Sequence, residues 1–248
     1  MEQIEGKNPV REALRAGARL DRLIVAKGSE QSLREILGLA STAGIPIQWR
    51  ERDWLDKKSV SRAHQGVIAW RRPVGYMELQ DLVARAYELS SEPLIVILDG
   101  LQDPHNLGSV LRTAEAVGAH GVVIPKRRAV GLTATVAKVS AGAVEYVPVA
   151  QVTNLSQAIT ALKDAGLWVV GADMDGEALH FEADLTGPMA LVVGGEDKGL
   201  ARLTKDRCDF TVRLPMYGKI NSLNAAVAAA VMLYEVVRQR VSTKTSHG

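Results

Sequence analysis

The sequence has little cysteine and no long apolar run. Cys208 is the only cysteine in 248 residues, so the chain can form neither an intramolecular disulfide nor a thiolate zinc cage. No run of about 18 consecutive apolar residues occurs, as a membrane-spanning helix would need. The first residues lack the pattern of a secretory signal peptide. From these absences we expect a soluble, cytoplasmic protein.

The sequence also lacks a strong excess of charge of either sign. Lys and Arg total 30 against 28 for Asp and Glu, a net charge of +2. The distribution is uneven, because residues 1–72 carry a net +5 and the remaining residues a net −3. A basic N-terminal segment predicts that this part of the chain binds a polyanion.

Several common catalytic signatures are missing. There is no G-x-G-x-x-G after the first strand of the second half and no G-x-x-x-x-G-K-[ST], which disfavours dinucleotide-binding and P-loop enzymes. No G-x-S-x-G elbow supplies a hydrolase nucleophile. The five histidines show no metal-ligand spacing, so no metal is expected.

What is present is an alternation of helix-like and strand-like segments. Residues 1–72 read as a small α/β domain, 73–92 as a linker, and 93–248 as a larger α/β domain. From Leu94 onward, continuous apolar strands alternate with helices, which predicts a parallel sheet covered on both faces. The expected strands are 22–26, 45–49, 66–70, 94–98, 121–124, 167–172, 189–193 and 210–214, and the expected helices 9–16, 32–43, 79–89, 106–116, 155–165 and 224–238.

Three segments follow predicted strands, where ligands bind in open α/β sheets. In the first, 99–116, Asn106 lies at or near a helix N-cap and Arg112 lies inside the helix. The second, 191–200, runs from a strand into Gly-Gly-Glu and places Glu196 in a loop. The third, 214–228, ends a strand and starts an Ala-rich helix that Ser222 or Asn221 could cap. Taken alone, each segment also fits a structural role, as a cap, a tight turn or a helix start.

Together the segments read N-x-x-x-x-x-R, G-G-E-x-x-G-L and L-P-M-x-G-x-x-x-S-L-N. This order resembles the SpoU/TrmH family of RNA ribose 2′-O-methyltransferases in the SPOUT superfamily. At the front, I-E-G-K-N-P-V-R-E-A-L (4–14) and H-Q-G-V-I-A (64–69) resemble the small RNA-binding domain of RlmB-like members. The resemblance covers nearly the whole chain.

The resemblance implies a C-terminal parallel-sheet domain with a deep trefoil knot, preceded by a small α/β RNA-binding domain of the ribosomal-protein type. It implies S-adenosylmethionine as methyl donor, RNA as partner, and a homodimer through the catalytic domain. The implied cofactor-binding residues are Gly194, Gly195, Leu214, Met216, Ser222 and Leu223, and the implied catalytic residues are Asn106, Arg112, Glu196, Ser222 and Asn224.

The activity implied is 2′-O-methylation of a ribose, at a guanosine of large-subunit (23S) ribosomal RNA. The alternatives are a tRNA ribose 2′-O-methyltransferase and a non-catalytic RNA-binding factor of ribosome assembly. Arg112 could act as a base or as a cationic stabiliser, and because arginine is almost never deprotonated in proteins the cationic role is favoured. Lys126, Arg127 and Arg128 form the strongest basic patch of the second domain, either an RNA contact or a solvated loop.

Overall fold

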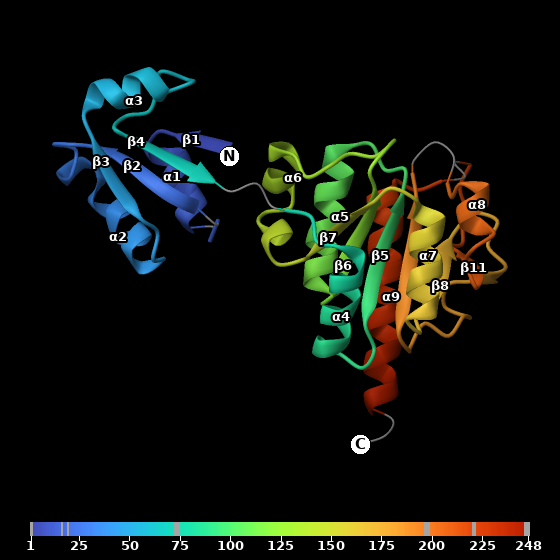
Figure 1. Ribbon diagram of the computed structural model, residues 1–248. Coiled ribbons are helices and arrows are strands. Elements are labelled where there is room, and N and C mark those ends of the chain that lie inside the picture. The colour runs from blue at the N-terminus through green and yellow to red at the C-terminus, as the bar shows by residue number, and fades with distance from the viewer. Residues whose placement is uncertain are drawn as a thin grey trace. The chain divides into compact units, whose positions relative to one another are not determined.

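The computed structural model divides the chain into two compact units, Met1–Val74 and Gly75–Gly248 (Figure 1). The residues described are 2–15, 17–18, 20–71, 75–195, 199–219 and 222–245. Within these ranges no helix is both long and apolar enough to cross a bilayer.

The small unit is a four-stranded sheet with helices, in the strand order β1-β4-β2-β3. Only β2 and β3 are parallel; β4 pairs antiparallel with both β1 and β2. Its elements are β1 (Glu2–Glu5), α1 (Lys7–Arg15), β2 (Leu20–Ala26), η1 (Gln31–Leu33), α2 (Arg34–Thr42), β3 (Ile47–Arg50), α3 (Arg52–Lys58) and β4 (Val67–Arg71).

The two faces of the small sheet are covered differently. Leu23 and Val25 of β2 pack with Val10 of α1 and Ile36 of α2 in the main core of this unit. Because strand residues alternate between faces, Ile24 points to the other side, where it meets Leu55 of α3. Each face therefore has its own apolar cluster, and the unit has a core of its own.

The larger unit is a seven-stranded parallel sheet with helices. Its elements are α4 (Leu79–Leu89), β5 (Leu94–Asp99), α5 (Pro104–Ala116), β6 (Gly121–Pro125), α6 (Ala134–Val139), η2 (Ala143–Glu145), β7 (Val149–Val152), α7 (Leu155–Asp164), β8 (Trp168–Ala172), β9 (Ala178–Leu179), β10 (Met189–Gly194), α8 (Arg202–Lys205), β11 (Phe210–Arg213) and α9 (Ala225–Thr245).

The strand order is β7-β6-β5-β10-β8-β11-β9, and every pairing in it is parallel. From β5 the chain first adds β6 and β7 on one side, then β8, β10 and β11 on the other. The point where the order reverses, between β5 and β10, is where open α/β sheets open a crevice for ligands. There Gly194 pairs with Asp99 at the carboxyl ends of both strands.

Helices cover both faces of this sheet (Figure 1). Leu82 of α4 and Ile159 of α7 pack with Ile95 and Ile97 in one buried cluster. On the other face α5 packs against α6 and α9. Val96 and Leu98, which alternate with the clustered residues of β5, are also buried. Burial on both faces explains why the strands read as unbroken apolar runs.

The expected linker 73–92 was wrong in its second half. Residues 79–89 form α4, and its Leu82 and Ala86 are fully buried in the core of the larger unit. This segment is amphipathic, so it gains more by packing on the sheet than by remaining a solvated connection. The α/β class and the parallel sheet are confirmed, whereas the trefoil knot stays a prediction.

Candidate functional site

A pocket of about 480 Å³ lies at the carboxyl ends of the central strands. Its walls come from four stretches, which follow β8, β10 and β11 and begin α9. The lining residues are Ala172, Asp173, Met174, Asp175, Val193, Gly194, Gly195, Gly199, Val212, Arg213, Leu214, Pro215, Met216, Ser222, Leu223, Ala225 and Ala228. The volume lies within the range of about 300–1,000 Å³ that small-molecule sites occupy.

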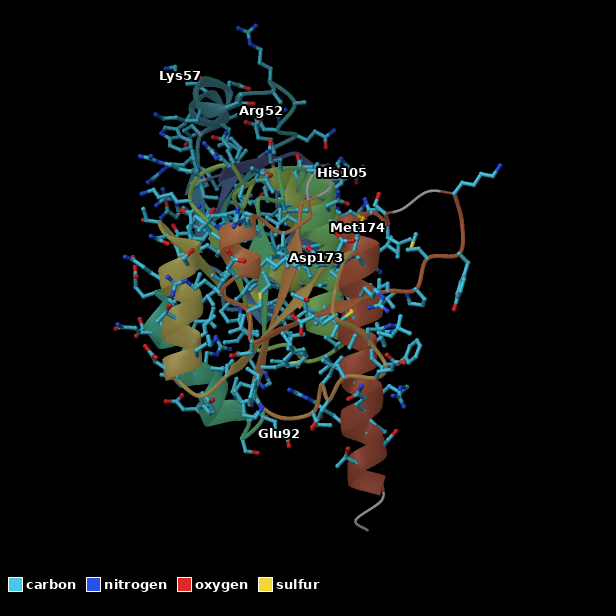
Figure 2. All side chains as sticks on the ribbon, turned by 90° about the vertical axis from the view of Figure 1, so that its right-hand side faces the viewer. Arg52, Lys57, Glu92, His105, Asp173 and Met174 are labelled. Carbon is cyan, nitrogen blue, oxygen red and sulfur yellow. The ribbon has the colours of Figure 1, made fainter. Side chains whose placement is uncertain are left out.

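The pocket lies at one end of the larger unit. Figure 2 shows Asp173 and Met174 toward the same end as His105 of α5, whereas Glu92, which precedes β5, lies at the opposite end. Parallel strands deliver all their following loops to one edge of the sheet. The segments after β5, β8, β10 and β11 therefore share one end of the unit.

Two glycines of the pocket wall allow backbones to touch. A β carbon on Gly194 would collide with the backbone of Gly199 and Leu200. One on Gly195 would lie 2.9 Å from the carbonyl oxygen of Gly100, too close for any real side chain. The Gly195 N–H donates a hydrogen bond of 2.9 Å to the Asp99 carbonyl. The Gly-Gly sequence thus lets three chain segments pack with no side chain between them.

Asn106 and Asn224 meet beside this wall. The Asn224 Nδ2 donates a hydrogen bond of 3.0 Å to the Oδ1 of Asn106, which is 8% exposed. The Oδ1 of Asn224 accepts from the N–H groups of Ala226 and Val227, at 3.0 and 3.2 Å. One amide therefore caps the start of α9 and joins it to α5.

Asn106 lies near the N-cap of α5, as expected, but is not the cap itself, and Ser222 does not cap α9. Asp103 caps α5 by accepting from the His105 N–H at 2.8 Å, with Pro104 next in the helix, so Asn106 lies inside the first turn. Asp and a following Pro are preferred at these two positions, which explains the shift. Asn224 replaces Ser222 as the cap of α9, and Asn221 lies outside the described residues.

The other residues expected at the site divide into those that line the pocket and those that do not. Gly194, Gly195, Leu214, Met216, Ser222 and Leu223 all line the pocket. Arg112 lies on the exposed side of α5, without a side-chain hydrogen bond or ion pair to any residue in the described ranges. Glu196 lies outside the described residues. The structure thus joins Asn106, Asn224 and Ser222 in one region and leaves Arg112 on the neighbouring surface.

The sequence interpretation missed the loop after β8. Asp173 lines the pocket, and its Oδ1 accepts from Lys205 Nζ at 2.8 Å and from the Asp175 N–H at 3.0 Å. The hydrogen bond to Asp173 raises the pKa of Lys205. Polar residues directly after a buried strand were the available signal.

Cys208 shows that nucleophilic thiol chemistry has no basis here. Burial raises the pKa of its thiol to about 12, and its Sγ donates to the Thr204 carbonyl at 3.3 Å. A thiol that stays protonated is a poor nucleophile. No group of three or more His, Cys, Asp or Glu residues in the described ranges could hold a metal ion.

Comparisons with known proteins agree across both units. Residues 93–234 match the SpoU rRNA Methylase family, and residues 3–77 match a family described as RNA 2′-O ribose methyltransferase substrate binding. A Bacillus subtilis (strain 168) protein, YacO, whose name assigns it to the TrmH family of tRNA/rRNA methyltransferases, is 50% identical over 95% of this chain and 94% of its own.

Two solved structures show the same architecture. The SpoU methyltransferase AviRb from Streptomyces viridochromogenes, in complex with the cofactor AdoMet, is 28% identical, with a TM-score of 0.70 over 97% of this chain and 90% of its own. A TrmH/SpoU tRNA modifying enzyme from A. aeolicus is 29% identical, with a TM-score of 0.56 over 67% of this chain and 86% of its own.

Proposed function

The chain belongs to the SpoU rRNA methylase family, and from that membership we propose that it methylates the 2′-hydroxyl of a guanosine ribose in large-subunit (23S) ribosomal RNA, with S-adenosylmethionine as donor. The observation that carries the proposal is the convergence of the second and third sequence segments on one pocket, with Asn224 of the third bonded to Asn106 of the first. We place the reaction in the cytoplasm.

The residues of the pocket fit this cofactor. Main-chain groups near Gly194, Gly195 and Leu214, which line the pocket, can match the donor and acceptor edges of an adenine. Met216 and Leu223 offer apolar contacts, and Ser222 a hydroxyl. When bound, S-adenosylmethionine supplies a methyl group activated by its sulfonium.

Arg112 is the residue that we assign to the RNA side. It is exposed on α5, the helix that carries Asn106, and no carboxylate in the described ranges neutralises it. A guanidinium binds phosphate through two parallel hydrogen bonds and can stabilise negative charge on a ribose oxygen. Arg112 would hold the RNA and lower the barrier to loss of the 2′-hydroxyl proton.

The other side chains would position these groups. Asn106 orients the start of α5 through its bond to Asn224, and Asn224 fixes the start of α9 next to Ser222. Glu196, outside the described residues, would hold Arg112 or a backbone donor. Alignment of donor and acceptor is the main requirement for methyl transfer from a sulfonium, so positioning is the chief task of these residues.

A tRNA ribose is the second candidate substrate. The A. aeolicus tRNA modifying enzyme aligns with 67% of this chain, a smaller part than the 97% that aligns with AviRb. We rank ribosomal RNA first because residues 3–77 add a substrate-binding unit to the catalytic domain, although the description of that family names RNA without its class. A non-catalytic role in ribosome assembly is favoured by no observation at the pocket.

We also propose that the larger unit forms a homodimer through α9. Val227, Val231 and Tyr234 are 50%, 40% and 55% exposed at helical spacing on this helix, and Leu223, just before it, is 39% exposed. An apolar stripe of this kind on one helix fits a second copy of the same helix. Val237 continues this spacing and is half-buried.

The proposal is tested by mapping ribose methylation. RNA from cells with and without the protein is digested and compared by mass spectrometry, and the purified protein is then assayed on protein-free 23S ribosomal RNA and on tRNA with labelled S-adenosylmethionine. A methyl group on one 23S guanosine that depends on the protein supports the proposal. Methylation of tRNA alone would select the second candidate, and cofactor-free RNA binding would select the third.

A further inference from the structure

Three consecutive cations stand unneutralised at the sheet edge that carries the pocket. Lys126, Arg127 and Arg128, here called the basic rim, follow directly after β6. All three side chains are exposed. None of the three side chains forms a hydrogen bond or an ion pair with a residue in the described ranges.

Four other cations of the larger unit have partners within the protein. Lys163 pairs with Asp209 at 2.7 Å, Lys205 with Asp173 at 2.8 Å, and Arg238 with Glu235 at 2.7 Å. Arg240 donates to the carbonyls of Glu92 and Gly187, at 2.8 and 2.7 Å. Against this background, adjacent cations without an acidic partner mark a surface suited to an external anion.

The basic rim is held in place by its main chain. The Lys126 N–H donates to the Val152 carbonyl at 2.8 Å and the Val130 N–H to the Leu101 carbonyl at 2.9 Å. The Leu132 N–H donates to the Tyr76 hydroxyl at 2.9 Å. The loop is thus fixed before and after the two arginines, which lowers the entropy cost of binding through them.

The backbone of Arg128 has a conformation that its side chain disfavours. Its φ is +57°, in the left-handed region where a β carbon crowds the following carbonyl and glycine is the usual occupant. Folding alone would therefore be served better by glycine here. An arginine at such a position indicates a side chain that is used in binding.

The loop is also attached to the segment that leads from β5 into α5. The bond from Val130 ends on Leu101, between β5 and the Asp103 cap of α5, and α5 carries both Asn106 and Arg112. The basic rim therefore lies at the same sheet edge as the site and follows the neighbouring strand.

Resting on the proposed function, we propose that the basic rim binds the phosphates of the substrate RNA next to the ribose that is methylated. Contacts from lysine and arginine to phosphate oxygens fix the position of a nucleic acid but carry no sequence information. The contact should therefore position the RNA and strengthen its binding equally for all sequences, while Arg112 acts at the target nucleotide.

The test uses the full chain with Arg127→Ala and Arg128→Gly combined. The dissociation constant for a short mixed-sequence single-stranded RNA is measured against salt concentration. Because each lost phosphate contact lowers the slope of log affinity against log salt by about 0.7, the double variant should lose about 1.4. The KM for 23S ribosomal RNA should rise, with kcat and S-adenosylmethionine affinity unchanged.

Two controls separate this role from a structural one. Arg202→Ala with Arg207→Ala removes the same charge from exposed positions at α8 and should leave the salt slope as in the wild type. Arg128→Gly alone should weaken RNA binding without lowering Tm, since glycine relieves the left-handed backbone, whereas Arg128→Lys should keep most of the affinity.

The outcomes distinguish the two proposals. If the wild type binds and methylates RNA while the double variant keeps the wild-type salt slope and KM, the basic rim has no part in RNA binding. A fall in Tm for Arg128→Gly with unchanged RNA affinity would also overturn the inference. If the wild type neither binds nor methylates any RNA, the proposed function itself fails.

Discussion

The side-chain amide of Asn224 donates to the side-chain oxygen of Asn106 across 118 residues of sequence, at 3.0 Å. The same Asn224 caps α9 through its other amide atom. A single residue thus couples the start of the last helix to the helix that carries Arg112. Changes at Asn224 should therefore affect both stability and methyl transfer.

Asn224→Ala should lower the free energy of unfolding by about 1 kcal/mol, the usual cost of losing an N-cap, and should also reduce methyl transfer. Asn224→Asp keeps an acceptor for the α9 cap and removes the donor to Asn106, so it should keep stability better than activity. Urea unfolding and single-turnover kinetics measure the two effects. The matched control is Asn154→Ala, which removes the cap of α7 and should cost similar stability with no loss of activity.

Arg112→Ala should reduce the rate of methyl transfer about 10²–10³-fold, because it removes a charge that acts on the developing oxyanion. S-adenosylmethionine affinity should stay unchanged, since Arg112 does not line the pocket. Single-turnover kinetics at saturating cofactor measure the rate, and calorimetry the affinity. Arg85→Ala, an exposed arginine of α4, is the control. A rate within a few-fold of the wild type would remove Arg112 from the mechanism.

Gly194→Ala should abolish cofactor binding, because the added methyl group would collide with the backbone of Gly199 and Leu200 and push the pocket wall apart. Calorimetric titration with S-adenosylmethionine measures this. Gly187→Ala is the control, since a β carbon there meets no atom within 4 Å. Wild-type affinity in Gly194→Ala would show that the wall tolerates displacement and that its backbone does not hold the cofactor.

Val227→Glu with Val231→Glu should convert the proposed dimer into a monomer, since two carboxylates on the α9 stripe would have to be buried without partners. Light scattering at micromolar concentration gives the mass. Leu203→Glu, at a 73% exposed position on α8, should leave the mass unchanged. A monomeric wild type would count directly against the interface.

Glu5→Gln should destabilise the small unit in a pH-dependent way. Partial burial of the Glu5 carboxylate raises its pKa, but hydrogen bonds from Ser59, Ser61 and the N–H groups of Val60 and Ser61 outweigh this and lower the pKa from 4.5 to about 2. A depressed folded pKa gives stability that is complete above 4.5 and disappears as pH falls through about 2.

The measurement is the difference in unfolding free energy between the wild type and Glu5→Gln across that range. The difference should be largest at neutral pH and vanish near pH 2, because both side chains are then uncharged. Glu12→Gln is the control, since the Glu12 carboxylate only makes exposed ion pairs with Arg11 and Arg15, at 3.7 and 3.5 Å. A pH-independent difference would mean that the Glu5 charge is not what stabilises the loop.

Much of the fold could be read from the sequence because its buried strands are strongly patterned. The expected strand 94–98 and helix 79–89 correspond to β5 and α4. Short or polar elements were missed: β1 reads Glu-Gln-Ile-Glu and α3 begins Arg-Asp, so neither shows a long apolar period. The role of α4 was misjudged because a linker and a covering helix differ only in what they pack against.

The site was predictable where local rules apply and not where distant segments meet. The Gly-Gly of 194–195 signals close backbone approach by itself, and the structure shows that approach. Asp103 followed by Pro104 is a better cap signal than Asn106, because Asp is preferred at the N-cap and Pro at the first helical position. The bond between Asn106 and Asn224, and the place of Asp173 on the pocket wall, depend on tertiary packing, which spacing along the chain does not encode.

The pocket walls, drawn from residues 172–175 through 222–228, bear on how the protein is made. A chain emerging from the ribosome completes the four strands of its small unit after 71 residues, whereas the last pocket wall is synthesised near the very end. Long-range parallel pairing is slow to form, and domains fold as units in the order of synthesis. For most of its synthesis, a nascent chain therefore carries a folded small unit. Its pocket can form only when translation is nearly complete.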